Sequence, residues 1–573
     1  MTGPHRLPEG GLIDRSRPIG FRFDGKAYCG FAGDTLASAL LGAGVHLVGR
    51  SFKYHRPRGI LAAGAEEPNA LVQIEDGARS DPNLRATQVE LVEGLSARAQ
   101  NCWPGPRFDV GAINESFSRL FPAGFYYKTF MWPAAFWMAY EHVIRRAAGL
   151  GVAPQARDPD RYDKTFAHCD VLVVGAGPAG LAAALAAAET GARVILAEQD
   201  YEPGGGLLAS PGETIDGRPA RDWVAETRAA LESFPEVTVL TRTQAYGYFD
   251  HNFIALIERV TDHLADKPEH LPRQRLWKLR ARQVVLATGA IERPLVFRDN
   301  DRPGIMLAEA CRTYLHRFAV RPGRRAVVFT NNDGAYRTAL DLEAAGVEIA
   351  AVVDLRSEPE GPYSAEAEAA GLPVLAGYGI IATEGRRRVR RLRVARITET
   401  GDRALRAGET LDCDLVAVSG GWNPTLHLFS QSRGKVRFDE RLGCFVPGRS
   451  AQAERSAGAC NGAFDLGSCL QQGLEAGAAA AEVAGFPAKS GRSVPAASRR
   501  GFLPARWLWA VPSDRPIGRG GKHFVDFQND VTAADLRLAL REGYGSIEHV
   551  KRYTTTGMGT DQGKTANVNA IGI

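Results

Sequence analysis

A glycine-rich turn between an apolar run and an alanine-rich run constrains the fold of this chain most. Residues 168–174 are largely apolar, Gly175, Gly177 and Gly180 follow directly, and residues 181–190 are rich in alanine. This order predicts a strand, a tight turn and a helix. The first glycine permits the sharp bend, the second lets a pyrophosphate approach the backbone, and the third lets helix and strand pack closely. The start of the helix then favours phosphate groups.

An acidic residue lies where such a turn requires one. Residues 194–197 form a second apolar run, which ends at Glu198, 23 residues after Gly175. A carboxylate there accepts hydrogen bonds from a ribose and repels a 2′-phosphate, so NAD or FAD is favoured over NADP. Strand, glycines, helix and acid together predict an adenine dinucleotide site. The alternative is a purely structural glycine-rich turn.

The same layout is repeated at residues 324–355, where the three glycine positions are Thr330, Asn332 and Ala335. A side chain at 332 would crowd a pyrophosphate, so we expect this unit to keep its fold and to have lost or weakened its nucleotide site. The predicted fold class is therefore α/β with two Rossmann-like dinucleotide-binding domains. Further residues match the layout of disulfide-reductase-like flavoproteins with two such domains: Gly204, Gly205, residues 287–289 and Asp465.

Patterning along the chain predicts six parts. In residues 1–100, an Asp24-Gly25 turn indicates a hairpin and residues 36–42 a short helix. The parts are a small β-rich module (1–100), an aromatic connector or interface region (101–165), the nucleotide-binding Rossmann domain (166–295 with 425–485), the degenerate second Rossmann domain (296–424), a linker (486–520) and a small α C-terminal module (521–573).

Composition excludes several classes of protein. The 573 residues carry 70 basic and 65 acidic side chains, a net charge of +5, and 45% are hydrophobic. This is a globular balance, and the charge is too small to require a nucleic-acid partner. The basic run 386–391 is interpreted as a solvated strand edge. The eight cysteines contain no C-x-x-C pair, which argues against a disulfide framework or zinc ribbon and fits a reducing, cytoplasmic compartment.

Two apolar segments resemble membrane spans only superficially. Residues 171–188 are uncharged but contain the glycine-rich turn, and residues 121–140 hold nine aromatic side chains together with Lys128 and Pro133. We therefore expect no membrane partner. The aromatic segment has two equally supported interpretations, an aromatic core or a buried subunit interface.

Three segments resemble the α subunit of heterotetrameric sarcosine oxidase: Gly49–Gly59, Glu67–Ala70 and His549–Lys564. The resemblance covers nearly the whole chain. The α subunit of that family continues into a folate-binding, aminomethyltransferase-like domain, so the resemblance implies that this chain corresponds to the N-terminal part, without that domain.

The resemblance implies an enzyme subunit whose complex demethylates sarcosine, or another secondary amine, oxidatively to glycine, formaldehyde and hydrogen peroxide. A beta subunit holds FAD and the amine site, FMN lies near the interface between alpha and beta, and gamma and delta subunits complete the complex. The alpha subunit binds NAD. No catalytic or metal-ligating residue is assigned to this chain. The expected cofactor-binding residues are Gly175, Gly177, Ala179, Gly180, Glu198, Gln199, Asp200, Gly205, Gly206, Ala245, Gly289, Ala459, Asp465 and Leu466.

Both end modules resemble [2Fe–2S] domains of related amine dehydrogenases. In the N-terminal, ferredoxin-like module the cysteine cluster of those relatives corresponds to residues 60–67, which contain no cysteine. In the C-terminal module the ligand positions correspond to Asp526, Gln528, Asp561 and Ala566. Since iron–sulfur clusters need thiolates, we expect no cluster in this chain, which favours oxidase chemistry at a flavin elsewhere.

The basic segments 51–59 and 551–556 are interpreted either as solvated loops or as phosphate or interface contacts, with His55 as a hydrogen-bonded structural residue. Other functions are a subunit of a related amine, opine or proline dehydrogenase, an autonomous FAD-dependent pyridine-nucleotide oxidoreductase, and a purely structural subunit. The autonomous enzyme would need a redox cysteine pair, which the sequence does not contain.

Overall fold

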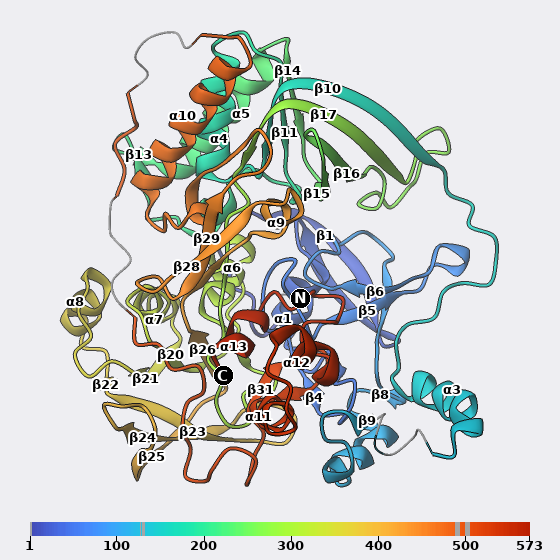
Figure 1. Ribbon diagram of the computed structural model, residues 1–573, viewed down its shortest axis with the longest axis vertical. Helices are drawn as coiled ribbons and strands as arrows, with labels where there is room; N and C mark the ends of the chain where they lie inside the picture. The colour runs from blue at the N-terminus through green and yellow to red at the C-terminus, as the bar shows by residue number, and fades with distance from the viewer. Residues whose placement is uncertain (1–2, 126–127, 129–131, 488–492, 499–504) are drawn as a thin grey trace. The chain divides into compact units, whose positions relative to one another are not determined.

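The computed structural model describes residues 3–125, 128, 132–487, 493–498 and 505–573 (Figure 1). The chain divides into two compact units, each assembled from separate stretches of sequence. Unit 1 comprises Met1–Pro159, Glu292–Gly421 and Ala505–Ile573, and unit 2 comprises Asp160–Ile291 and Trp422–Pro504. This division is coarser than the six predicted domains, whose boundaries stay predictions. Parts of the predicted aromatic segment and linker lie outside the described residues.

Unit 2 is built on a sheet whose parallel strands run in the order β14-β11-β10-β17-β30. Two strands pair with the edge of β17 that faces away from β10: β16 pairs antiparallel with residues 274–280, and β30 pairs parallel with residues 284–286. The strands are β10 (Tyr162–Val174), β11 (Val194–Ala197), β14 (Val237–Leu240), β15 (Thr243–Phe249), β16 (Phe253–Arg259), β17 (Gln274–Leu286) and β30 (Glu454–Ser456).

Helices α4 (Pro178–Ala188), α5 (Ala220–Ser233) and α10 (Leu466–Val483) belong to the same unit. α4 starts at Pro178, a favoured first position, and all but one of its alanines are buried, so it packs without large side chains. The predicted strand at 168–174 and helix at 181–190 are confirmed with shifted ends. Shorter elements are β12 (Thr214–Ile215), β13 (Arg218–Pro219), β27 (Trp422–Pro424), α9 (His427–Gln431), β28 (Lys435–Asp439) and β29 (Cys444–Arg449).

The N-terminal part of unit 1 is a five-stranded sheet in the order β2-β1-β7-β5-β6, with helix α1 (Leu36–Gly42). The predicted hairpin and helix are confirmed. Asp24 and Gly25 take positive φ values of 48° and 74° at the hairpin turn, and Thr35 caps α1. The strands are β1 (Asp14–Phe23), β2 (Lys26–Ala32), β3 (Gly49–Arg50), β4 (Pro57–Arg58), β5 (Leu71–Ile74), β6 (Asp81–Arg85), β7 (Ser96–Ala99), β8 (Pro104–Gly105) and β9 (Phe108–Asp109).

The middle part of unit 1 is a second parallel sheet in the order β19-β26-β20-β21-β22, as the repeated layout predicts. A three-stranded antiparallel sheet, β23-β24-β25, follows β22 in the sequence. The elements are β19 (Ile305–Leu307), α6 (Ala308–Phe318), β20 (Arg325–Thr330), α7 (Gly334–Ala344), β21 (Glu348–Asp354), α8 (Pro362–Ala369), β22 (Val374–Ala376), β23 (Tyr378–Glu384), β24 (Arg391–Ile397), β25 (Ala404–Asp412) and β26 (Leu415–Ser419).

The C-terminal part of unit 1 is small, and its longest elements are helices. Its elements are β31 (Phe524–Asp526), β32 (Val531–Thr532), α11 (Ala533–Arg541), α12 (Ile547–Thr554) and α13 (Asn567–Gly572). The connector before unit 2 carries helix α3 (Trp137–Ala147). Within the described residues, every helix is too short or too polar to cross a bilayer.

The interpretation of residues 386–391 as a strand edge is wrong for most of the run. Residues 386–390 connect β23 to β24, and only Arg391 belongs to a strand. Arg388 donates hydrogen bonds to the main-chain oxygens of Asp414 and Pro322. Its guanidinium therefore holds the loop against two neighbouring segments of unit 1.

Candidate dinucleotide site

The turn after β10 depends on two of its glycines. Gly175 has a φ of +100°, and a Cβ there would overlap the carbonyl oxygen of Ala287. A Cβ on Gly180 would overlap the carbonyl oxygen of Gly175. The bend and the close packing predicted for these positions are therefore both present.

Gly177 leaves open space at the start of α4. It is the N-cap residue, in an extended conformation with φ −73°, and α4 has no side-chain cap there. A Cβ built on Gly177 or on Gly206 would meet nothing within 4 Å. The first N–H groups of a helix have no partner within the helix. Open space in front of them fits a phosphate group.

A second glycine loop lies against this turn. Gly204 donates its N–H to the carbonyl oxygen of Ala176 over 2.8 Å, and a Cβ on Gly205 would lie 3.0 Å from the Gly177 Cα. The structure thus brings together the two glycine pairs that the sequence places about thirty residues apart.

Glu198 closes the site at the end of β11. Its Oε2 accepts a hydrogen bond from the Ala176 N–H over 2.7 Å, and its Oε1 accepts one from the Asp200 N–H over 2.8 Å. Burial raises the pKa of Glu198, with a further contribution from the charge of Asp200. A carboxylate has about four acceptor positions, so these backbone bonds leave acceptor capacity for a ribose hydroxyl.

The predicted residues from the second half of unit 2 belong to elements that pack against α4. Asp465 caps α10 by accepting from the Ser468 N–H, with Leu466 as the first helical residue. Ala459 lies in a short 3₁₀ turn whose Gly458, given a Cβ, would approach the Ala179 Cβ to 2.6 Å. Ala459 is therefore one residue from a direct neighbour of the cradle.

Three more predicted residues bond to strands and loops beside the turn. Gln199 accepts at its carbonyl oxygen from the Arg259 Nη2, and Ala245 lies on β15 opposite Leu256. Gly289 has a φ of +72° after β17 and accepts from the Thr425 N–H. Their assignment as cofactor contacts stays a prediction.

Sequence reasoning missed the residues that clamp α10 onto α4. A Cβ on Gly473 would overlap the carbonyl oxygen of Ala179, and a Cβ on Gly477 would overlap that of Ala183. The sequence does contain a signal for this packing: two glycines four residues apart lie on one face of a helix and allow another helix to approach closely. Arg242, whose guanidinium lies 5.6 Å from the Tyr201 ring centroid, was also missed, and no local pattern identifies it.

The second Rossmann-type turn is filled by its own side chains. Asn332 is buried, donates to the Ser419 Oγ over 3.0 Å and accepts from the Gly334 N–H. At the end of β21, the Asp354 carboxylate is occupied by the Arg356 guanidinium and the Tyr336 hydroxyl. The groups that would face a nucleotide are thus bonded within unit 1.

The basic segment 51–59 is part of a buried ionic network. Arg58 pairs with Asp301 and with Asp530, and Arg56 pairs with Asp301, Asp299 and Glu115. Burial alone would raise the pKa of Asp301, but the two guanidinium groups outweigh it and hold that pKa well below its usual range. His55 bonds Asp109 over 2.7 Å, as expected for a structural histidine.

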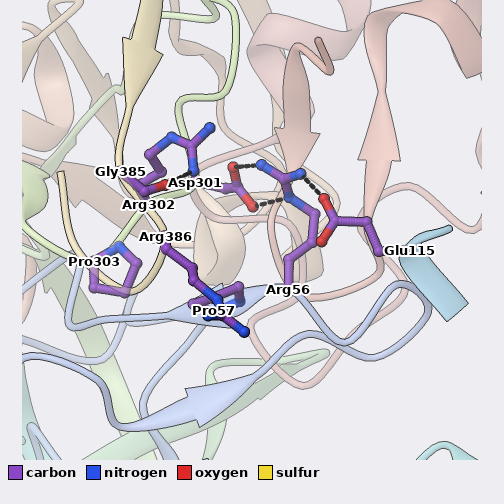
Figure 2. Close-up of a pocket in the computed structure, with 8 residues that line it drawn as sticks. All are labelled: Arg56, Pro57, Glu115, Asp301, Arg302, Pro303, Gly385 and Arg386. Carbon is purple, nitrogen blue, oxygen red and sulfur yellow. Dashed lines mark hydrogen bonds and ion pairs between the residues drawn. The ribbon is translucent and has the colours of Figure 1, made fainter. Parts of the chain in front are cut away.

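A cavity of about 300 Å³ opens beside this network (Figure 2). Four of the five Arg56 N–H donors bond carboxylates inside unit 1, so the guanidinium has at most one donor, on Nη1, for a ligand. The cavity lining is Arg56, Pro57, Glu115, Asp301, Arg302, Pro303, Gly385 and Arg386.

Comparisons with known proteins agree with this architecture. Residues 170–265 match the family model described as FAD dependent oxidoreductase, and residues 520–573 match the one described as Sarcosine oxidase A3 domain. A solved structure of L-proline dehydrogenase from P. horikoshii superposes with a TM-score of 0.64 at 20% identity, covering 99% of this chain and 93% of that one. This likeness shows the fold alone.

Two curated relatives match almost the whole chain. This chain is 48% identical over 99% of its length to "Sarcosine oxidase subunit alpha" of Rhizobium meliloti (strain 1021). It is 41% identical over 98% of its length to the protein of the same name from Corynebacterium sp. (strain P-1). The matches cover 56% and 53% of those proteins, so the chain spans about half the length of the curated relatives it matches.

One comparison corrects the cofactor expectation. Residues 16–102 match the family model described as 2Fe-2S iron-sulfur cluster binding domain, which contradicts the expectation that the chain has no iron–sulfur cluster and that its N-terminal module lacks such a role. The side chains fit a cluster poorly: Cys29 and Cys102 are the cysteines of this segment, and the described residues contain no group of three or more His, Cys, Asp or Glu placed to hold a metal ion. A ferredoxin-type [2Fe–2S] cluster is held by four cysteine thiolates, more than these two cysteines provide.

Proposed function

We propose that this chain is the alpha subunit of a sarcosine oxidase-like complex, in which it binds NAD and supports a flavin-bearing beta subunit. The complex would demethylate sarcosine, or a related secondary amine, oxidatively to glycine, formaldehyde and hydrogen peroxide, with gamma and delta subunits completing it. The similarity to two relatives named as alpha subunits supports this assignment. All eight cysteines are free, which supports a reducing, cytoplasmic setting.

The observation that carries the proposal is the open cradle at Gly177. The N-terminus of α4 has no side-chain cap, space is open beside Gly177, and Glu198 keeps acceptor capacity toward the same turn. When bound, the dinucleotide would have its pyrophosphate at the α4 N-terminus and its adenosine ribose at Glu198. This chain's residues bind and orient it, and the amine is oxidised on the partner subunit.

The direct test is to denature the purified chain and identify the released nucleotide by mass spectrometry. Release of NAD supports the proposal. Release of FAD would instead favour the autonomous flavoenzyme, the outcome that the match to the FAD dependent oxidoreductase model makes the main competitor. A chain that neither releases nor binds NAD contradicts the proposal.

A pair of variants separates binding from folding. In Gly177→Ala the new methyl group enters open space and the backbone conformation suits alanine, so the fold should be kept while the methyl group crowds the pyrophosphate. In Gly180→Ala the methyl group overlaps a main-chain oxygen, so stability itself should fall. Nucleotide loss in Gly177→Ala with an unchanged melting temperature is the expected result.

A further inference from the structure

Exposed apolar side chains are concentrated in one stretch of unit 1. Among the described residues, twelve of the twenty-five exposed large hydrophobic side chains lie between residues 103 and 152. This stretch carries β8, β9 and α3 (Figure 1). So many exposed apolar side chains in one short stretch are typical of a functional interface. We call the exposed side chains of Trp103, Phe108, Ile113, Trp132, Met138 and Val143 the connector face.

The same stretch is fastened on its inner side by polar contacts. His55 and Arg56 pair with Asp109 and Glu115, and the Arg50 Nε donates to the Pro106 carbonyl oxygen over 2.8 Å. These groups come from the basic segment and the strand before it. The N-terminal module therefore holds the first half of the connector, residues 106–115, in a fixed place.

The second half is fastened to the C-terminal module of unit 1. Ala123 donates its N–H to the Asp535 carboxylate over 3.0 Å, and the Lys128 amine pairs with Glu542 over 2.6 Å. Further on, the Val152 carbonyl oxygen accepts from the Gln73 side chain. A segment tied at this many points does not need its outward apolar side chains for its own packing.

The unpaired charges in the described part of the stretch that carries the connector face have one sign. Arg107, Arg119 and Arg146 are exposed, and the described part of the chain offers none of them an ion pair. The acidic groups of the stretch already have partners: Asp109 pairs with His55, Glu115 with Arg56 and Glu141 with Arg145. In a two-fold dimer of this chain these arginines would surround a self-complementary patch and repel one another. A different protein with an acidic rim fits better.

We infer that the connector face is the docking surface for the flavin-bearing beta subunit, through an apolar patch on that subunit rimmed by carboxylates. The inference rests on the proposed function, which supplies the partner. Aromatic side chains with arginines at the rim are the composition of energetically dominant interface residues. The inference resolves the two interpretations of the aromatic segment in favour of an interface.

The test measures the dissociation constant between the full chain and the beta subunit of its own source. Phe108→Asp and Trp132→Asp should each weaken binding at least about tenfold, because a carboxylate would enter an apolar contact. Phe166→Asp is the matched control: Phe166 lies in unit 2 and is 71% exposed, as is Phe108, so binding should stay within about twofold. Arg146→Glu should lower the association rate and its salt dependence.

Each other outcome overturns the inference in a distinguishable way. If the wild-type chain does not bind the beta subunit, the proposed function fails and the inference fails with it. If the wild-type chain binds but the connector variants bind like the control, only the inference fails. Dimerisation of the isolated chain that Phe108→Asp abolishes would assign the face to a second copy, and co-sedimentation with anionic phospholipid vesicles that Trp132→Asp abolishes would assign it to a membrane.

Discussion

Replacing Asp530 tests whether the basic segment is structural. Asp530 is fully buried, its Oδ1 pairs with the Arg58 guanidinium, and its Oδ2 accepts from the N–H groups of Lys53 and Tyr54 over 2.9 Å each. In Asp530→Asn the side-chain amide has one acceptor, so either the bond to Arg58 or both backbone bonds are lost. Arg58 then shares the single carboxylate of Asp301 with Arg56.

The expected cost follows from these contacts. A hydrogen bond to a charged group contributes about 1.5–3 kcal/mol and each backbone bond about 1 kcal/mol. Breaking a buried ion pair by removing one partner costs more, about 3–5 kcal/mol, because a buried charge loses its partner, and this figure sets the expected effect. Since about 1.4 kcal/mol corresponds to a factor of ten, the local opening equilibrium should rise at least about a hundredfold.

Native-state hydrogen exchange at the amides of residues 53–62 measures this local opening directly. A local measurement is needed because a chain of two units need not unfold in one step. The matched control is Asp250→Asn, which removes an exposed pair with Arg433 at 3.0 Å and should change exchange less than about fivefold. If Asp530→Asn exchanges no faster than this control, the buried network does not hold the segment, and the reasoning is refuted.

Three further outcomes follow from individual residues. Burial, with Arg298 and Arg537 nearby, lowers the pKa of His523 to about 4. The unfolded chain therefore takes up this proton first, and the free energy of unfolding should fall by roughly 3 kcal/mol as the pH drops from 6.5 to 4. His523→Leu should flatten this pH dependence, as measured by thermal unfolding. Gly473→Ala should lower the melting temperature of unit 2 and its nucleotide content, because the methyl group would separate α10 from α4, whereas Gly212→Ala, with open space around it, should do neither. Asp354→Asn should destabilise unit 1 by about 3–5 kcal/mol without loss of bound nucleotide, as measured by denaturant unfolding and nucleotide release.

Local chemistry was sufficient to predict the elements that carry the cradle. Gly175, Gly177, Gly180 and Glu198 each act through backbone conformation or position at a strand end, and both properties are readable over a few residues. The degenerate second turn was readable for the same reason, since Asn332 stands where close backbone approach requires glycine.

The sequence did not show which distant residues pair with one another in the fold. The basic segment was given two interpretations because its acids lie far away in sequence: Asp301 is 243 residues and Asp530 is 472 residues from Arg58. The outward direction of the aromatic connector was equally hidden, since burial depends on which segments cover it. The iron–sulfur expectation was wrong against the family comparison because it weighed only the ligand positions, whereas residues 16–102 match a cluster-binding domain as a whole.

The shared edge of β17 has a consequence for synthesis on the ribosome. β17 ends at Leu286, and β30, which completes the sheet beside it, begins at Glu454. At about 5–20 residues per second, translation leaves this hydrogen-bonding edge without its final strand for roughly 10–30 seconds. The nascent unit 2 therefore emerges with an open sheet edge, a feature that invites pairing between chains. Slow elongation between these two strands would lengthen the window in which chaperones must protect it.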